Sequence, residues 1–171
     1  GWFTDRIIDL LQRYTKLNTT CNLTIAISLD DFEQQHDQGR SLPGLYARAL
    51  ASYHAVSSSN HRRIKADVTL TVTAGNAARI SAIYHDLKQK GITSIFPVLV
   101  RAEGIIGELD DKDAIAAGYR KLCELTEADS SKLDSGMIGA LHKAKNRLAH
   151  DILSDNCINP RHLSPCRAGS L

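Results

Sequence analysis

Hydrophobic and polar positions alternate along the first hundred residues with two different periods. In residues 5–16 the apolar side chains recur at helical spacing between charged ones, which predicts an amphipathic helix. In residues 23–29, LTIAISL, large apolar residues alternate with Thr, Ala and Ser, as is typical of a strand with one buried face. The same alternation returns in residues 67–73, DVTLTVT, and predicts a second strand.

Helices are expected between and after these strands. Pro43 suits the first turn of a helix that runs through LYARALASYHAV, and the charged stretch before it reads as a loop. Asn76 can cap a helix over residues 77–90, which Gly91 terminates. Residues 94–100 predict a third strand whose extent Pro97 limits, and helices follow at about 111–128 and 134–155.

The order of these elements predicts an α/β fold. Strands that alternate with helices of about a dozen residues imply right-handed crossovers and a parallel sheet. One face of the first two strands carries only small or weakly polar side chains, so we expect it to line the chamber of an incompletely closed barrel. The opposite, apolar faces would pack against the helices. The alternative is an antiparallel sheet with one solvated side.

Composition and charge exclude several classes of protein. The chain has 171 residues, of which 43% are hydrophobic, so it can bury one sizeable core. Its net charge is only +2 without a block of like charges, which indicates neither a nucleic-acid arm nor a membrane-surface patch. No apolar run approaches the roughly 20 residues that cross a bilayer. We expect a soluble cytoplasmic protein that binds neither nucleic acid nor membranes.

Four cysteines stand too far apart for a C-x2-C zinc ribbon, and a disulfide framework is not indicated. Two of them, Cys157 and Cys166, flank a pair of prolines and are candidate metal or cluster ligands, although free cysteines are often merely buried. The chain begins at Gly1 without a methionine and stops at Leu171. We therefore expect a piece of a longer protein.

Polar side chains follow each predicted strand, at the edge where ligands bind in parallel α/β folds. The planar fork of Arg40 suits an anionic group, Ser28 can donate to the same group, and Asn76 can bond sugar hydroxyls. These groups are expected to converge. The full set is Ser28, Asp30, His36, Asp37 and Arg40 after the first strand, Thr73, Gly75 and Asn76 after the second, and Arg101 and Glu103 after the third.

Each of these side chains also has a simpler explanation. Asp30 and Asp37 are common turn formers, Asn76 suits a helix cap, and Arg40 suits a solvated surface. His36 beside Asp37 suggests a general base held by a carboxylate, but sequence neighbours seldom face each other, and no Ser or Cys nucleophile motif accompanies them. Residues 104–107, with a glycine at each end, are too short a pattern to indicate a phosphate loop.

Taken together, two stretches resemble the second half of the radical S-adenosylmethionine (radical SAM) enzyme core. Residues 24–50, TIAISLDDFEQQHDQGRSLPGLYARAL, are similar to a strand ending in S-L-D and an H-D-x-x-R-G-x-x-G loop. Residues 68–92, VTLTVTAGNAARISAIYHDLKQKGI, are similar to a strand ending in T-V-T-x-x-N. Gly1-Trp2 resembles the end of a T-N-G-W strand, and SPCRAGSL at 164–171 resembles the entry to a SPASM or Twitch-type extension. Ser41 departs from the usual glycine, and Gly39 from a common apolar residue.

The resemblance implies a fold, cofactors and partners. Residues 1–110 would be the C-terminal part of a (β/α)6 TIM-like barrel, 111–156 a helical bridge, and 157–171 the start of an auxiliary-cluster region. In this family a [4Fe-4S] cluster reductively cleaves S-adenosylmethionine (AdoMet) to a 5'-deoxyadenosyl radical that abstracts a substrate hydrogen. Flavodoxin or ferredoxin would donate the electron, and the substrate would be an unidentified small molecule or peptide.

The resemblance also assigns roles by position. Ser28 and Arg40 would contact the methionyl carboxylate of AdoMet, and Arg101 would face substrate or cofactor. No C-x3-C-x2-C motif occurs in the 171 residues, so this chain alone is expected to be inactive. An ordinary barrel enzyme such as an aldolase or isomerase, and a noncatalytic α/β binding module, stay open as alternatives. The remaining assignments are Thr73 and Asn76 near the ribose, and Cys166 with Cys157 as a second candidate for an auxiliary iron-sulfur cluster.

Overall fold

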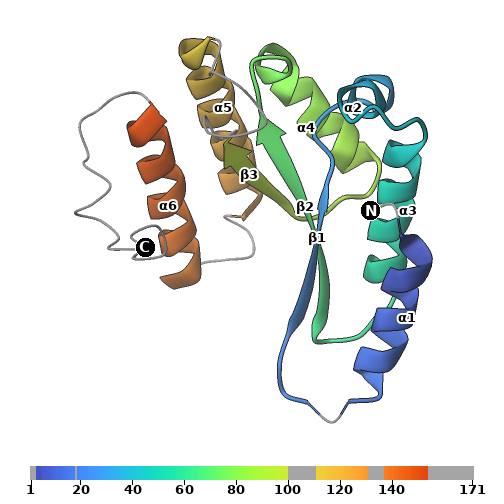
Figure 1. The fold of residues 1–171 in the computed structure, drawn as a ribbon. Helices are drawn as coiled ribbons and strands as arrows, with labels where there is room; N and C mark the ends of the chain where they lie inside the picture. Colours follow the sequence, from blue (N-terminus) through green and yellow to red (C-terminus); the bar gives the residue numbers. More distant parts are fainter. Residues whose placement is uncertain (1–2, 18, 100–110, 131–136, 154–171) are drawn as a thin grey trace, which may run out of the picture.

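A parallel sheet with helices packed against it forms the centre of the protein (Figure 1). The structure, a computed structural model, describes residues 3–17, 19–99, 111–130 and 137–153. The strands β1 (Leu23–Ser28), β2 (Ile64–Val72) and β3 (Ile95–Leu99) lie in the order β1-β2-β3. The helices are α1 (Thr4–Thr15), α2 (Glu33–Gly39), α3 (Leu45–Ser57), the short 3-10 helix η1 (Ala77–Arg79), α4 (Ile80–Gln89), α5 (Lys112–Ser130) and α6 (Met137–Leu153).

The parallel pairing predicted from the sequence is confirmed. In the ladder Ser28 lies opposite Thr69, and Val68 lies opposite Ile95. Helices connect each strand to the next, as the alternation of the two periods predicts. The antiparallel alternative is therefore wrong. Over the described residues the chain is an α/β unit with a three-stranded parallel sheet, which is consistent with part of an α/β barrel.

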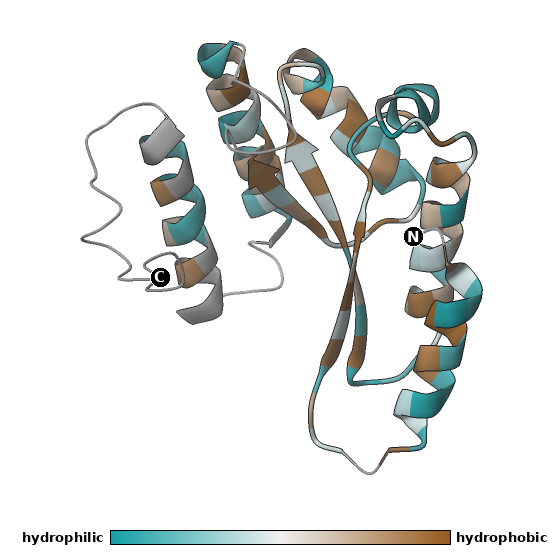
Figure 2. Cartoon of the chain, in the orientation of Figure 1, coloured by the Kyte–Doolittle hydropathy of each residue, from teal (hydrophilic) through white to brown (hydrophobic). Residues whose placement is uncertain are grey.

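The two faces of the sheet differ in burial as the alternation predicts. Val68, Leu70 and Val72 of β2 are completely buried, while Thr24 and Ser28 of β1 are exposed. Helix α3 packs against β1 and β2, and α5 packs against β3. Figure 2 shows the resulting alternation of hydrophobic and hydrophilic positions along the strands. Among the described residues, the helices thus cover the apolar face and leave the small polar face open.

Helix α2 stands where the sequence predicts a loop. Its residues, EQQHDQG, contain no apolar side chain, so hydrophobic periodicity cannot reveal it. A helix this short is not stable by itself in water. Tertiary contacts hold it, because α2 packs on α3 and its one buried side chain, His36, lies beneath it.

Two glycines set the course of the chain around α4. Gly91 has a φ of 82° and ends this helix, as predicted, because glycine adopts the left-handed conformation without a steric penalty. On α5, a Cβ at Gly118 would lie 3.0 Å from Cα and Cβ of Ala77. The missing side chain lets α5 pack directly against η1 and thereby supports the turn after β2.

The buried hydrophobic residues form one cluster that joins the sheet to α1, α3, α4 and α5. Fully burying an aliphatic side chain of this kind stabilises a fold by about 1.5–3 kcal/mol. No helix in the described ranges is long and apolar enough to cross a membrane. Arg101, Cys157 and Cys166 lie outside the described residues, as does the expected extension at 157–171.

Candidate functional site at the carboxyl edge of the sheet

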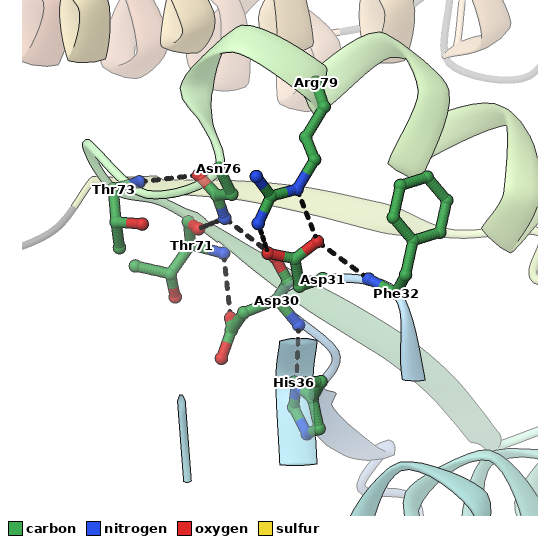
Figure 3. Close-up of polar contacts among 8 residues, drawn as sticks. All are labelled: Asp30, Asp31, Phe32, His36, Thr71, Thr73, Asn76 and Arg79. Carbon is green, nitrogen blue, oxygen red and sulfur yellow. Dashed lines mark hydrogen bonds and ion pairs between the residues drawn. The ribbon is translucent and has the colours of Figure 1, made fainter. Parts of the chain in front are cut away.

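The carboxyl ends of β1 and β2 meet around Asp30 (Figure 3). Oδ1 of Asp30 accepts a hydrogen bond from the Thr71 N–H (3.0 Å), and Oδ2 pairs with the Arg40 guanidinium. Its backbone carbonyl accepts a hydrogen bond from Asn76 Nδ2 (2.7 Å), and its N–H donates to Nδ1 of His36 (3.2 Å). We call these five residues the Asp30 cluster. It links β1, α2, β2 and the start of η1 through one aspartate.

Asn76 holds the turn that follows β2. Its Oδ1 accepts a hydrogen bond from the Thr73 N–H (2.8 Å), and Nδ2 donates to the carbonyls of Asp30 (2.7 Å) and Thr71 (2.8 Å). The residue precedes η1 but, contrary to the predicted helix cap, its side chain makes no capping bond and turns back to the strand ends. Both amide hydrogens bind backbone and the residue is 2% exposed, so Asn76 holds the edge in shape.

His36 is buried beneath α2, with 3% of its surface exposed. Because Nδ1 accepts the Asp30 N–H, the neutral ring carries its hydrogen on Nε2, which has no hydrogen-bond partner within the described part of the chain. The Tyr46 ring lies edge-on at 5.7 Å between centroids. Burial lowers the pKa of His36, the neighbouring Arg40 lowers it further, and the carboxylates of Asp30, Asp37 and Asp31 oppose the shift. The neutral imidazole is the form that this site accommodates.

Asp37 faces away from His36 and caps α3. Its Oδ2 accepts a hydrogen bond from the Gly44 N–H (2.5 Å), and its Oδ1 accepts one from the Tyr46 N–H (2.8 Å). These are donors that the first turn of a helix leaves unsatisfied. Within the described part of the chain, neither ring nitrogen of His36 bonds to the adjacent Asp37 carboxylate.

The second aspartate after β1, Asp31, binds a different arginine. Its Oδ1 accepts hydrogen bonds from the Phe32 N–H (2.8 Å) and Arg79 Nε (3.0 Å), while its Oδ2 accepts one from Arg79 Nη2. This two-pronged pair ties the end of β1 to the last residue of η1 (Figure 3). Sequence reasoning assigned it no role, because nothing in either local pattern links residues 48 positions apart.

Four of the residues singled out from the sequence lie at this edge. Ser28 Oγ is within 3.1 Å of Thr69 Oγ1 on β2, and Ser28 is exposed. Arg40 keeps 48% of its side chain exposed while pairing with Asp30, and Thr73 is half-buried beside Asn76. Hydrogen bonds thus join Arg40 and Asn76 to Asp30, and Thr73 to Asn76, while Ser28 lies at the end of β1 in contact with Thr69. Arg101, Cys157 and Cys166 lie outside the described residues.

The loop after α2 retains a glycine-like backbone at Ser41. This residue stands where the resembled family usually has glycine, and its φ is 51°. For an ordinary L-residue the left-handed conformation is disfavoured by roughly 1–2 kcal/mol. The departure at Ser41 therefore leaves the left-handed turn in place and strains it. This turn lies directly after Arg40, so its backbone conformation affects the orientation of the Arg40 side chain.

A separate hollow of about 540 Å³ lies between α5 and α6. Both cationic and anionic side chains line it, and Arg120 donates to His150 Nε2 from Nε (3.2 Å). None of the residues predicted from the sequence lines it. The charged lining residues are Arg120, Lys143 and Arg147 on the positive side and Glu124, Glu127 and Asp151 on the negative side.

The Asp30 edge fits a ligand that carries a carboxylate. The exposed guanidinium of Arg40 and the exposed hydroxyl of Ser28 are donors of the kind that bind carboxylates. A catalytic iron-sulfur cluster does not fit the residues present: the described ranges hold no group of three or more His, Cys, Asp or Glu placed to bind a metal ion. The sequence likewise lacks C-x3-C-x2-C.

No protein-family model and no curated protein match the chain. Solved structures of anSMEcpe, an anaerobic sulfatase-maturating enzyme of the radical SAM SPASM type, resemble it. The native enzyme with AdoMet and the Cp18Cys peptide gives a TM-score of 0.52 at 10% identity, over 75% of this chain and 35% of that chain. The complex with the Kp18Cys peptide and the histidine-tagged enzyme with AdoMet each give 0.53, with the same identity and coverage. The chain thus shares the fold of part of this enzyme, and it spans about a third of the neighbour's length.

Proposed function

We propose that this chain is the AdoMet-binding part of a radical SAM enzyme, and that the methionyl end of AdoMet binds at the Asp30 cluster. The observation that supports this most strongly is the Arg40 guanidinium, which Asp30 holds at the strand ends while 48% of the side chain stays exposed. An arginine fork fixed at the strand ends, at the same edge as an exposed serine hydroxyl, suits a carboxylate. The solved neighbours that share this fold hold AdoMet.

In this proposal each side chain has a distinct task. Arg40 and Ser28 bind the methionyl carboxylate, while Asp30 orients Arg40 through its carboxylate. Thr73 lies near the ribose, and Asn76 positions the turn that carries it. Arg101 is proposed to face substrate or cofactor.

The rest of the machinery belongs to the complete protein. A bound [4Fe-4S] cluster supplies the electron that cleaves AdoMet in this class of enzyme, and its ligands are proposed to lie outside these residues. We propose Cys166 and Cys157 as ligands of an auxiliary cluster, and flavodoxin or ferredoxin as the electron donor. The proposed substrate is a peptide, because anSMEcpe binds the Cp18Cys peptide.

Two other functions would need the same fold. A barrel aldolase or isomerase needs a side chain at the strand ends that is available to move a proton or form a Schiff base. The Asp30 carboxylate is instead bonded to Thr71 and Arg40. A noncatalytic binding module would not require an exposed arginine held in this way. The AdoMet proposal gives this arginine a role, and we therefore favour it over both alternatives.

The complete protein, purified without oxygen and loaded with its cluster, tests this proposal. AdoMet binding is measured by equilibrium dialysis, and release of 5'-deoxyadenosine is measured after reduction. We expect Arg40→Met to weaken binding by about 10- to 100-fold, since a charged hydrogen bond contributes about 1.5–3 kcal/mol. Arg62→Met, on an exposed residue just before β2 at the opposite end of the strands, is the matched control and should leave both readouts unchanged. A loaded wild-type protein that neither binds nor cleaves AdoMet would refute the proposal.

A further inference from the structure

We infer that His36 is a positioning residue that sets the affinity for AdoMet by holding Asp30 and, through Asp30, the Arg40 guanidinium. This inference rests on the proposed function and adds a regulatory element to the same site. A ligand at this edge cannot contact His36 directly, since only 3% of the surface of His36 is exposed. Its effect on a ligand must therefore pass through its neighbours.

The contacts form a closed circuit of three residues. The Asp30 N–H donates to Nδ1 of His36 (3.2 Å), and the carbonyl of His36 accepts the Arg40 N–H (3.1 Å) across one turn of α2. The Arg40 side chain then returns to the Asp30 carboxylate. Because Asp30 is bonded at its N–H, carbonyl and carboxylate, loss of the imidazole contact releases one of its anchors and loosens the support of Arg40.

Only the neutral imidazole closes this circuit. A protonated ring carries a hydrogen on Nδ1, which would point at the Asp30 N–H instead of accepting it. It would also place a second cation beside Arg40. The charges of three nearby carboxylates, those of Asp30, Asp37 and Asp31, favour the protonated form of the ring, although Asp37 directs its oxygens at the start of α3. The Tyr46 ring from α3 lies edge-on to the imidazole.

The sign of the pH dependence follows from burial. Burial and Arg40 together lower the pKa of His36 below its usual 6.5, so the ring is neutral at neutral pH. Protonation then occurs only as the solution becomes acidic. The affinity for AdoMet is expected to be full at neutral pH and to fall as the pH is lowered through the depressed pKa.

Two substitutions distinguish the effect of the imidazole's hydrogen-bond acceptor from the effect of its volume. In His36→Asn the amide oxygen takes the place of Nδ1 as an acceptor and does not titrate, whereas His36→Leu fills the space without an acceptor. We measure AdoMet dissociation constants of the complete, cluster-loaded protein by equilibrium dialysis at about pH 7.5 and at the lowest pH at which the protein stays folded. At the higher pH we expect His36→Asn to bind within about threefold of wild type, and His36→Leu to bind about tenfold more weakly.

The pH dependence of AdoMet affinity separates a positioning role of His36 from a purely structural one. Wild type should lose affinity as the pH falls through the lowered pKa of His36, and His36→Asn should show no such loss. If His36→Asn loses affinity in acid as wild type does, or if wild type itself shows no loss, the inference is overturned while the AdoMet site stands. If wild type fails to bind AdoMet at either pH, the proposed function itself fails. Should His36→Leu not fold, as thermal unfolding will show, the pH profile of His36→Asn decides alone.

Discussion

The two aspartates that follow β1 are adjacent in the chain but serve two different regions of the molecule. Asp31, whose side chain is 11% exposed, forms a two-pronged pair with Arg79 of η1, whose side chain is 40% exposed. Asp30 pairs with Arg40 at the end of a short polar helix, where 48% of the arginine side chain is exposed. Both pairs thus use the same two residue types at similar exposure, since Asp30 is 17% exposed, but with different pairing geometry.

The difference between the two pairs shows how similar side chains can stabilise the fold in one place and remain available to a ligand in another. Arg79 directs both Nε and Nη2 at one carboxylate, so its fork is used to join β1 to η1. Asp30 uses its second oxygen to bind the Thr71 N–H, so it holds Arg40 through one oxygen and leaves the rest of the fork accessible. We therefore expect substitutions at the Asp31 pair to affect stability and those at Arg40 to affect ligand affinity.

The largest expected loss of stability comes from Asn76→Ala, at the turn between β2 and η1. Three backbone groups lose their partner at a residue that is 2% exposed. Leaving buried polar groups unpaired should lower the free energy of unfolding by about 3 kcal/mol, measured by urea denaturation. Asn22→Ala, at an exposed position, is the control and should change it by less than about 0.5 kcal/mol. Equal effects of the two substitutions would show that the Asn76 bonds carry no stability.

The comparison itself is tested by Arg79→Met against Arg40→Met. The first leaves the Asp31 carboxylate, which is largely buried, without its charged partner and should lower the free energy of unfolding by about 1–2 kcal/mol. The second removes a pair made through one carboxylate oxygen, while the other oxygen of Asp30 keeps its bond from the Thr71 N–H, and it should lower the free energy of unfolding by at most about 1 kcal/mol. Urea denaturation of both variants measures the difference. If Arg40→Met is the more destabilising of the two, the division of duties is wrong.

A smaller effect of opposite sign is expected from Ser41→Gly. The left-handed φ of 51° at Ser41 suits glycine, which should stabilise the fold by about 0.5–1 kcal/mol after allowing for the greater freedom of glycine in the unfolded chain. The melting temperature should rise by a few degrees. Ser58→Gly is the matched control, because Ser58 has a φ of −77° and the same exchange there should not stabilise. A fall in the melting temperature of Ser41→Gly would contradict the strain argued for this turn.

The smallest expected effect is on the pH dependence of stability. A histidine whose folded pKa is lowered contributes stability that is complete above its unfolded pKa of 6.5 and is lost as the pH falls from there toward the folded pKa. His36→Asn should flatten the loss of stability in this window, measured by urea denaturation at several pH values. An unchanged slope would mean that His36 takes up a proton without disturbing the native state.

Sequence patterns predicted the parts of the fold that depend on local periodicity. The alternation in β1 and β2 predicted which face is buried, and Gly91 marked the end of α4. Helix α2 was not predicted, because it has no apolar side chains whose spacing would reveal a helical period. Its stability comes from tertiary packing. Local signals likewise misjudged Asn76, whose residue type suits a helix cap but whose partners are strand ends.

The sequence predicted where the candidate site lies but not which side chains bond to one another there. Topology put the groups after β1 and β2 at one edge, so Ser28, Arg40 and Asn76 were found from the sequence. The partnerships were not, because Arg79 meets Asp31 across 48 positions and Asn76 meets Asp30 across 46. Such contacts arise only once the sheet has formed. Asp30, which looked like an ordinary turn former, is consequently the residue whose importance the sequence hid.

The most direct test of the AdoMet site is a crystal structure of the complete protein with AdoMet bound. It should show the methionyl carboxylate within hydrogen-bonding distance, about 2.7–3.2 Å, of the Arg40 guanidinium, with Arg40 still paired to Asp30. AdoMet bound elsewhere, for example in the hollow between α5 and α6, with Arg40 open to solvent, would contradict the account.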